Sequence, residues 1–595
     1  MAVRKAEKSN YRRKFVHPNG NKFRKSAYLC TTNRRIMGKK CIMTLLLALV
    51  TLSGQAQTKK KATTALEQIS ITAETTLNPQ QKVTAHMKAG SYEGPIGIKL
   101  RGNSSLSFNQ KKYTIELRDE MGKDIDAPLL GMPAHSDWVL LAPYNDVSMV
   151  RDPLAFQLWR EMGHWGPRTQ MVEVVFNGDY RGIYILCEAI KRGEDRVDVS
   201  KLKKSDVKGR DVTGGYILRI DTYNDDDATF VSKVPGVGPG IMTSQITWSC
   251  IYPKKKNLQP EQMTYIQNYV DTMEAVIQGK DFADPQKGYA RYIDVPSFVD
   301  YFIHTELSLN ADGYKRSAYF YKEKQHEDGT GGKIHAGPVW DYNLAYGNNS
   351  FCGSNQFEDW CFEGCNTQPT PAFWQRLLQD PAFRKAVKVR YQELRKNVLS
   401  TKNLYAIIDK QAKLLQKAKD HHFQTYPELL VDKNKQQSNR PQSPMGGQQH
   451  MNSHQPMNGT QPPMGGFGGG FGGFGGGGFG GGFGMFAGRN FNFDPLAMFT
   501  AYRVSSYEEE ITILKQWFAD RLAFLDKNID RFDSDWEPRI QELKEIQMQF
   551  GNGFPFGGGP NPFGSGGSSP FGSGSGNNGR APFPGGGAPF PFGGF

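Results

Sequence analysis

The stretch Met171-Val-Glu-Val-Val-Phe-Asn-Gly-Asp-Tyr-Arg-Gly-Ile-Tyr-Ile-Leu-Cys-Glu188 carries the clearest structural signal in the chain. Apolar β-branched and aromatic residues flank Asn177-Gly178, a dipeptide that favours the tight turn of a β-hairpin. The stretch therefore predicts two antiparallel strands, over 171–176 and 180–186. Shorter runs predict further strands at 96–101 and 112–117, working outward from this hairpin.

Helical spacing becomes prominent later in the chain. Apolar residues recur at intervals of three and four over 266–277, and again over 511–529 after a Ser505-Ser506 start with acidic residues in the first turn. Strands dominate early and helices late. The sequence therefore predicts an α+β fold with a sheet-rich N-terminal part and a helical C-terminal part.

Composition divides the 595 residues into ordered and glycine-rich parts. We expect one globular domain over 57–432, completed by helices of the same domain over 493–549. Residues 433–492 are rich in Gln, Gly and Phe, and residues 550–595 in Gly, Pro and Phe. Glycine-rich chain loses too much backbone entropy on folding to pack a core, so these parts are predicted to be a disordered insertion and a disordered tail. Their role is either a flexible spacer or weak adhesion through the spaced phenylalanines.

The N-terminus predicts export. An apolar stretch over 43–52 follows Lys39-Lys40 and precedes small residues up to Ala56, which is typical of a signal peptide over 37–56. Residues 1–36 are then expected to be upstream sequence translated by mistake. The apolar stretch is too short to span a membrane, and a buried N-terminal helix is the alternative. We expect a periplasmic, cell-surface or extracellular protein.

The net charge of +14 suggests a polyanionic partner, but the distribution of charge does not support one. Residues 1–56 hold 13 of the 73 Lys and Arg and 1 of the 59 Asp and Glu, which leaves 60 basic and 58 acidic residues in the remainder. The basic character belongs to the N-terminus. No nucleic-acid partner is expected.

Cysteine usage is compatible with an oxidising compartment. Five cysteines follow residue 56, and three of them fall within the fourteen residues Cys352 to Cys365. A disulfide from Cys352 to Cys361 or Cys365 would pin this loop. Free thiols and a metal site are the alternatives, although no His lies close to the cluster.

Three polar clusters stand at the ends of predicted strands and helices. Arg101-Gly-Asn-Ser-Ser105 precedes Lys111-Lys112, and such a turn offers N–H groups and hydroxyls to phosphate oxygens. Asp312 follows a helical-looking segment, and Asp341 follows Gly337-Pro-Val-Trp340. Two carboxylates 29 residues apart fit metal-assisted phosphoryl transfer, in which one orients the attacking hydroxyl and the other holds Mg²⁺. An ordinary turn or helix cap is the alternative for each cluster.

These clusters occur in the order of the motifs of the CotH (spore coat protein H) family, together with Tyr144-Asn-Asp146, Arg151 and the hairpin ending at Glu188. The chain resembles this family over residues 90–430 and again over 505–530. The resemblance implies a highly diverged protein-kinase-like fold. It also implies transfer of the ATP γ-phosphate to Ser or Thr of protein substrates, with ATP and Mg²⁺ or Mn²⁺ as cofactors.

The resemblance also implies roles for individual residues. Asp312 matches the catalytic-loop aspartate, and Asp341 matches the metal-binding aspartate. The strand lysine that meets the phosphates is matched best by Lys111, with Lys112 as the second candidate. The remaining site residues are Arg101, Asn103 and Glu188 at the nucleotide, with pairing to the lysine as the alternative role of Glu188, and Ser317 near the position of a second metal ligand.

Two departures from an ordinary kinase leave the activity open. Ser317 replaces the usual Asn, and serine is a neutral, short metal ligand; an ordinary glycine loop is absent as well. The first hypothesis is an exported CotH-like protein kinase acting on proteins rich in Ser and Thr. The second is a non-catalytic surface, adhesive or structural binding protein on the same fold, including a pseudokinase. The third is another phosphotransferase, for example one acting on glycans.

Overall fold

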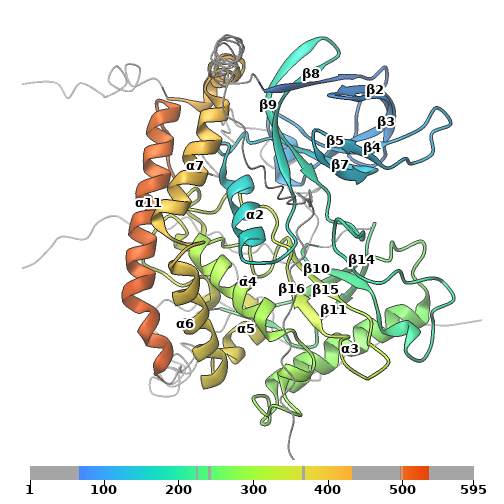
Figure 1. The fold of residues 1–595 in the computed structure, drawn as a ribbon, viewed down its shortest axis with the longest axis vertical. Coiled ribbons are helices and arrows are strands. Elements are labelled where there is room, and N and C mark those ends of the chain that lie inside the picture. The colour runs from blue at the N-terminus through green and yellow to red at the C-terminus, as the bar shows by residue number, and fades with distance from the viewer. Residues whose placement is uncertain are drawn as a thin grey trace, which may run out of the picture. The chain divides into compact units, whose positions relative to one another are not determined.

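The computed structural model of the chain describes residues 66–222, 226–238, 243–364, 369–431, 496 and 500–534. The upstream extension predicted for 1–36, the signal peptide at 37–56, the insertion at 433–492 and the tail at 550–595 lie outside these residues. The fold within the described part mixes strands and helices (Figure 1), which confirms the α+β prediction.

The described strands form a barrel and three smaller sheets. The strands are β1 Glu67–Thr72, β2 Val83–Ala89, β3 Tyr92–Arg101, β4 Lys112–Leu117, β5 Ala127–Leu129, β6 Met132–His135, β7 Asp137–Leu141, β8 Thr169–Phe176, β9 Asp179–Glu188, β10 Tyr216–Ile220, β11 Ala228–Val231, β12 Gly236–Val237, β13 Thr243–Ser244, β14 Thr247–Tyr252, β15 Ala318–Lys322, β16 Ile334–Ala336 and β17 Thr370–Pro371.

The N-terminal part is a closed barrel in the order β1-β2-β3-β4-β7-β9-β8. Neighbouring strands are antiparallel except for β1 and β8, which close the barrel in parallel with Ile69 opposite Val174. The sequence predicted a sheet-rich part but not its closure. The closing pair joins segments about a hundred residues apart, and local patterns carry no information about such pairing.

The predicted hairpin is confirmed as β8 and β9. Asn177 and Gly178 both adopt positive φ, of 51° and 86°, as the tight hairpin turn requires. Side chains alternate along β9, so that Tyr184 and Leu186 pack inside the barrel while Ile185 joins the core beneath the helices. This strand therefore links the two hydrophobic cores.

The described helices cover the remainder of the fold. They are α2 Arg151–Glu161, α3 Pro260–Gln278, α4 Val295–Ser308, α5 Ala372–Leu377, α6 Pro381–Arg395, α7 Thr401–Leu415, α8 Lys419–Thr425 and α11 Tyr507–Asn528. The helices predicted around 266–277 and 511–529 are confirmed as α3 and α11. Ser506 caps α11 by accepting a hydrogen bond from the Glu509 N–H, as its position before the acidic first turn predicts.

The second half of the fold also contains a five-stranded sheet in the order β11-β14-β10-β15-β16. The sequence predicted a mainly helical C-terminal part, and this sheet departs from that expectation. Figure 1 shows this sheet apart from the barrel, with α3 beside it. It positions the site because Asp312 precedes β15 and Asp341 follows β16.

The structure gives the bonding state of four of the five cysteines after residue 56. Cys352 is disulfide-bonded, whereas Cys187, Cys250 and Cys361 are free thiols. Pairing of Cys352 with Cys361 is therefore excluded, and the partner of Cys352 lies outside the described residues.

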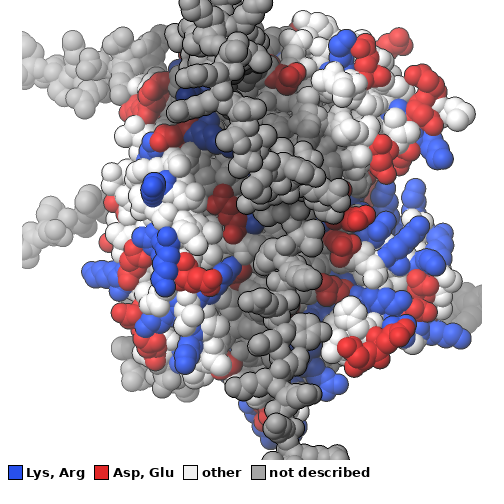
Figure 2. Space-filling model, viewed as in Figure 1, with Lys and Arg blue, Asp and Glu red and all other residues white. Residues whose placement is uncertain are grey.

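Basic and acidic side chains are intermixed over the described surface of the face shown in Figure 2. None of the described helices has the length and apolar character that a membrane span requires.

Candidate functional site

The Asp341 loop meets the barrel at Lys112. The Lys112 Nζ lies 3.8 Å from the Asp341 Oδ1, and the lysine side chain is only 10% exposed whereas that of Asp341 is 46% exposed. Asp341 has a φ of 65°, an uncommon conformation for a residue with a side chain. A partly exposed carboxylate held in this way beside a buried cation is accessible to a ligand.

The Lys111 side chain contacts the turn before β4, whereas the Lys112 side chain contacts Asp341. Its Nζ donates to the Leu106 carbonyl at 2.7 Å, and burial lowers its pKa. Lys112 lies opposite Arg101 in the β3–β4 register. The geometry favours Lys112, the second candidate, as the lysine that faces the site.

Arg101 contacts the Asp341 loop through the neighbouring tryptophan. Its guanidinium lies 5.0 Å from the centre of the Trp340 ring, a distance that suits a cation–π interaction. Asn103 is exposed in the turn after β3, where its carbonyl accepts from the Leu106 N–H. This turn is tight, because a Cβ on Gly102 would lie 2.0 Å from the Ser105 Oγ.

Asn310 contacts both the Asp312 loop and the Asp341 loop. The Asn310 Oδ1 accepts from the Asp312 N–H at 3.3 Å, and its Nδ2 donates to the Asp341 carbonyl at 3.5 Å. Asn310 is buried. This one side chain therefore connects the two aspartate loops.

Asp312 occupies a mixed electrostatic environment. Its side chain is 32% exposed, and the Arg316 Nη1 lies 3.8 Å from its Oδ1. Burial raises the pKa of Asp312, the cations Arg316 and Lys315 oppose that shift, and the negative charge of Asp341 adds to it. A carboxylate with a raised pKa suits proton transfer better than an ordinary aspartate does.

Glu188 and Ser317 are not brought to this cluster. Glu188 is fully buried, and its Oε1 lies 2.7 Å from the Arg168 Nη2 and also contacts the Arg196 Nη1. It therefore pairs with arginines and not with Lys111 or Lys112. Ser317 has a φ of 50° directly before β15, and within the described residues no contact brings its hydroxyl to Asp341.

Asp152 is a site residue that the sequence reasoning missed. It is buried in the first turn of α2, and its Oδ1 accepts from the Tyr342 N–H at 2.6 Å. Burial and the adjacent Asp341 raise its pKa to about 7, against the opposing charge of Lys112. The sequence carried only an indirect signal, because Asp152 directly follows Arg151 of a family motif.

The donor set fits a magnesium–nucleotide complex better than a protein-only metal site. Among the described residues, no three His, Cys, Asp or Glu side chains are gathered to hold a metal ion. Mg²⁺, however, is commonly held by one or two carboxylates plus substrate phosphates. Asp341 offers such a carboxylate, with the cation Lys112 beside it.

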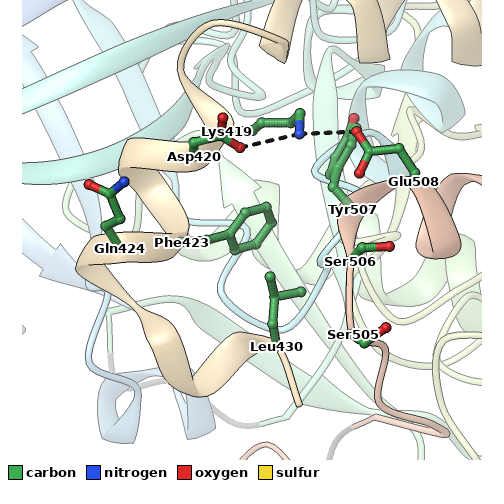
Figure 3. Close-up of a pocket in the computed structure, with 9 residues that line it drawn as sticks. All are labelled: Lys419, Asp420, Phe423, Gln424, Leu430, Ser505, Ser506, Tyr507 and Glu508. Carbon is green, nitrogen blue, oxygen red and sulfur yellow. Dashed lines mark hydrogen bonds and ion pairs between the residues drawn. The ribbon is translucent and has the colours of Figure 1, made fainter. Parts of the chain in front are cut away.

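A separate pocket of 280 Å³ lies between α8 and the start of α11, as Figure 3 shows. Its Lys419 pairs with Asp420 at 3.2 Å and with Glu508 at 3.0 Å. None of the predicted site residues lines it. The polar cluster around Asp341, and not this pocket, is the candidate site.

The part of the chain that contains the Asp341 cluster is similar to known proteins. The CotH kinase protein family matches residues 98–452, which include Lys112, Asp152, Asp312 and Asp341. The chain is also similar to inner spore coat protein H of Bacillus subtilis (strain 168), with 24% identity over 307 residues that cover 51% of this chain and 72% of that protein. Since the family match spans more than half of the sequence, this chain belongs to the CotH kinase protein family.

Proposed function

We propose that the chain is a CotH-like atypical protein kinase that transfers the γ-phosphate of ATP to Ser or Thr hydroxyls of protein substrates. The observation that carries the proposal is the meeting of three polar groups from separate elements. Lys112 comes from β4, Asp341 follows β16, and Asn310 joins the Asp341 loop to the Asp312 loop. In this proposal the barrel and the helical part correspond to the two lobes of a diverged kinase-like fold.

Each group suits one part of phosphoryl transfer. Lys112 would neutralise phosphate oxygens, and Asp341 would hold Mg²⁺ or Mn²⁺, which when bound withdraws charge from the phosphates. Asp312 would accept the proton of the substrate hydroxyl as the hydroxyl oxygen bonds to the γ-phosphorus. The bond between the γ-phosphorus and the bridging oxygen breaks, and ADP leaves with that oxygen.

The proposal differs from the sequence-based predictions in the roles of several residues. Lys112 takes the role first assigned to Lys111, and Arg101 supports the Asp341 loop through Trp340. Glu188 and Ser317 have no part in it, because Glu188 pairs with arginines and Ser317 has no contact with Asp341 in the described residues. Export remains part of the proposal on the strength of residues 37–56 alone.

The test is phosphotransfer by the purified 57–595 protein with labelled ATP, Mg²⁺ or Mn²⁺, and peptides rich in Ser or Thr. We expect label in the peptide that requires the metal and disappears when every Ser and Thr is replaced by Ala. Circular dichroism establishes that the protein is folded. Absence of transfer by the folded protein with both metals would contradict the proposal and favour the non-catalytic binding protein.

A further inference from the structure

Helix α11 carries two buried charged side chains, Glu510 and Arg521. Arg521 is 0% exposed and Glu510 is 2% exposed, whereas Glu508 in the first turn of the same helix is exposed. A buried charge is costly unless it is paired and hydrogen-bonded, so these two residues have specific partners. The helix also lies outside the family match, which ends at residue 452.

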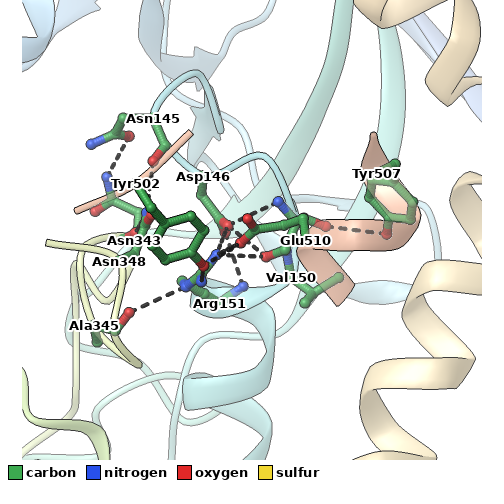
Figure 4. Close-up of polar contacts among 11 residues, drawn as sticks. Asn145, Asp146, Val150, Arg151, Asn343, Ala345, Asn348, Tyr502, Tyr507 and Glu510 are labelled. Atoms are coloured by element: carbon green, nitrogen blue, oxygen red, sulfur yellow. Dashed lines mark hydrogen bonds and ion pairs between the residues drawn. The ribbon is translucent and has the colours of Figure 1, made fainter. Parts of the chain in front are cut away.

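Glu510 holds an arginine that reaches the Asp341 loop. The Arg151 Nη1 lies 2.6 Å from the Glu510 Oε1 and 2.5 Å from the Asp146 Oδ1, and its Nη2 donates to the Tyr502 hydroxyl at 2.9 Å (Figure 4). The Nε of the same guanidinium donates to the Ala345 carbonyl at 3.2 Å. The planar guanidinium fixes these directions relative to one another. Glu510 therefore constrains the loop that follows Asp341.

A second set of hydrogen bonds anchors the same loop. The Asn343 Nδ2 donates to the Asn145 Oδ1 at 2.7 Å, and the Asn348 Nδ2 donates to the Asn145 carbonyl at 2.7 Å (Figure 4). The Ala501 N–H, just before α11, donates to the Asn348 carbonyl at 3.1 Å. The segment leading into α11 thus supports the Asp341 loop directly.

Arg521 holds the end of α4, from which the Asp312 loop emerges. Its Nε and Nη2 donate to the Glu306 carbonyl at 3.0 and 2.5 Å, and its Nη1 donates to the Phe357 and Asp359 carbonyls, each at 2.6 Å. Carbonyls at a helix C-terminus lack partners within the helix, so Arg521 satisfies one of them. The helix end is thereby fixed six residues before Asp312.

The Glu306 side chain extends this support into the loop. Its Oε1 accepts from the Tyr314 hydroxyl at 2.8 Å, and its Oε2 accepts from the Cys361 N–H at 2.8 Å. The Cys361 Sγ lies 3.1 Å from the Asn310 carbonyl. The Asn310 carbonyl on one side of Asp312 and the Tyr314 side chain on the other are therefore both connected to Glu306, whose carbonyl accepts from Arg521.

We propose that α11 is part of the functional site, with Glu510 positioning the Asp341 loop through Arg151 and Arg521 positioning the Asp312 loop through Glu306. The proposal rests on the proposed kinase activity for its kinetic consequences, but its structural content does not depend on that activity. A helix that only stabilises the fold would affect both loops alike. Separate effects of the two side chains distinguish positioning from general stabilisation.

The test compares Glu510→Gln with Arg521→Lys in the 57–595 protein. Glu510→Gln should weaken Mg-ATP binding about tenfold, as loss of a residue that orients a metal ligand does. Arg521→Lys should leave Mg-ATP affinity unchanged and lower kcat about tenfold, because small displacements of a reacting group are costly. If Glu510→Gln prevents folding, Tyr502→Phe replaces it as a milder change beside Arg151. If Arg521→Lys prevents folding, Glu306→Gln replaces it.

Matched controls come from two partly exposed ion pairs of the same helix. Glu508→Gln removes the pair with Lys419, and Lys515→Gln removes the pair with Asp409. Neither residue contacts the two aspartate loops. Both controls should retain the wild-type affinity and kcat.

Amide hydrogen exchange gives a measurement that does not need activity. Exchange over 341–348 should rise more in Glu510→Gln than in Arg521→Lys, and exchange over 309–317 should show the reverse. Equal changes in both loops, or none, would overturn the positioning proposal whether or not the protein is a kinase. If wild type transfers no phosphate but the two loops respond separately, the positioning proposal stands and the kinase proposal fails.

Discussion

The two aspartate loops obtain their electrostatic environments in different ways. Asp341 is 46% exposed, and its cation is Lys112, which comes from the barrel. Asp312 is 32% exposed, and its cations Lys315 and Arg316 belong to its own loop. The cation beside Asp341 therefore depends on how distant segments meet, whereas the cations beside Asp312 are local in the sequence. This difference suits Asp341 to bind a cation. It suits Asp312, whose pKa is raised, to accept a proton.

Asp312→Asn should give the largest effect on turnover. The substitution keeps the volume and removes the charge, so we expect ATP binding within a few fold of wild type and phosphotransfer reduced about a hundredfold or more. Single-turnover assays with labelled ATP measure the second quantity, and calorimetry measures the first.

The alternative for Asp312 is a structural turn residue. In that case Asp312→Asn would cost about 1 kcal/mol of stability, and the folded fraction would keep its activity. Equal phosphotransfer by the variant and wild type would remove Asp312 from the mechanism and abolish the contrast between the loops.

Asp341→Ala should act on binding. We expect the metal-dependent affinity for ATP to fall by roughly ten- to a hundredfold, as when a metal site loses an essential group. The partly exposed side chain should leave the fold intact. Calorimetry with Mg-ATP, alongside circular dichroism, measures both. An unchanged affinity in the folded variant would show that Asp341 does not hold the cation.

Asp152→Asn tests the charge balance beside Asp341 in the metal-free protein. Asp152 has a pKa of about 7 in the folded protein, above the ordinary value of 3.8. The folded state therefore binds the proton more tightly than the unfolded state does, and wild-type stability falls as the pH rises from about 4 to about 7. Asparagine cannot lose a proton. The free energy of unfolding of the variant minus that of wild type should therefore increase as the pH rises from about 4 to about 7, by up to about 1.4 kcal/mol per pH unit.

Urea denaturation at several pH values measures this difference. Asp284→Asn is a suitable control, because Asp284 is a partly exposed aspartate whose pKa is lowered by hydrogen bonds from the Gln286 and Lys287 N–H groups of its own turn. Parallel stability curves for Asp152→Asn and wild type between pH 4 and 7 would contradict the raised pKa.

Lys112→Met and Lys111→Met form a matched pair with the smallest expected effects. Lys112→Met should weaken ATP binding about tenfold, because a charged hydrogen bond to phosphate is lost. Lys111→Met should change it within about twofold, because Lys111 bonds to the Leu106 carbonyl. Calorimetry measures both affinities. The reverse order would restore Lys111 as the lysine at the phosphates.

Local sequence patterns determined individual elements of the fold. Asn177-Gly178 specified the hairpin because its turn requires two residues with positive φ, and both residues have it. Apolar spacing and Ser506 specified α11. Asp312 and Asp341 could be chosen as candidates because each follows a regular element whose end is visible in the sequence.

Only the tertiary structure decided which side chains meet. Lys111 directly precedes β4 and Lys112 is its first residue, so the choice between them depended on the β3–β4 register, which places Lys112 opposite Arg101. Asp152 gained its role from packing against the Asp341 loop, through the Tyr342 N–H. Glu510 reaches Arg151 across 359 residues of chain. Such long-range contacts follow from how the elements pack together, and no local spacing of residue types encodes them.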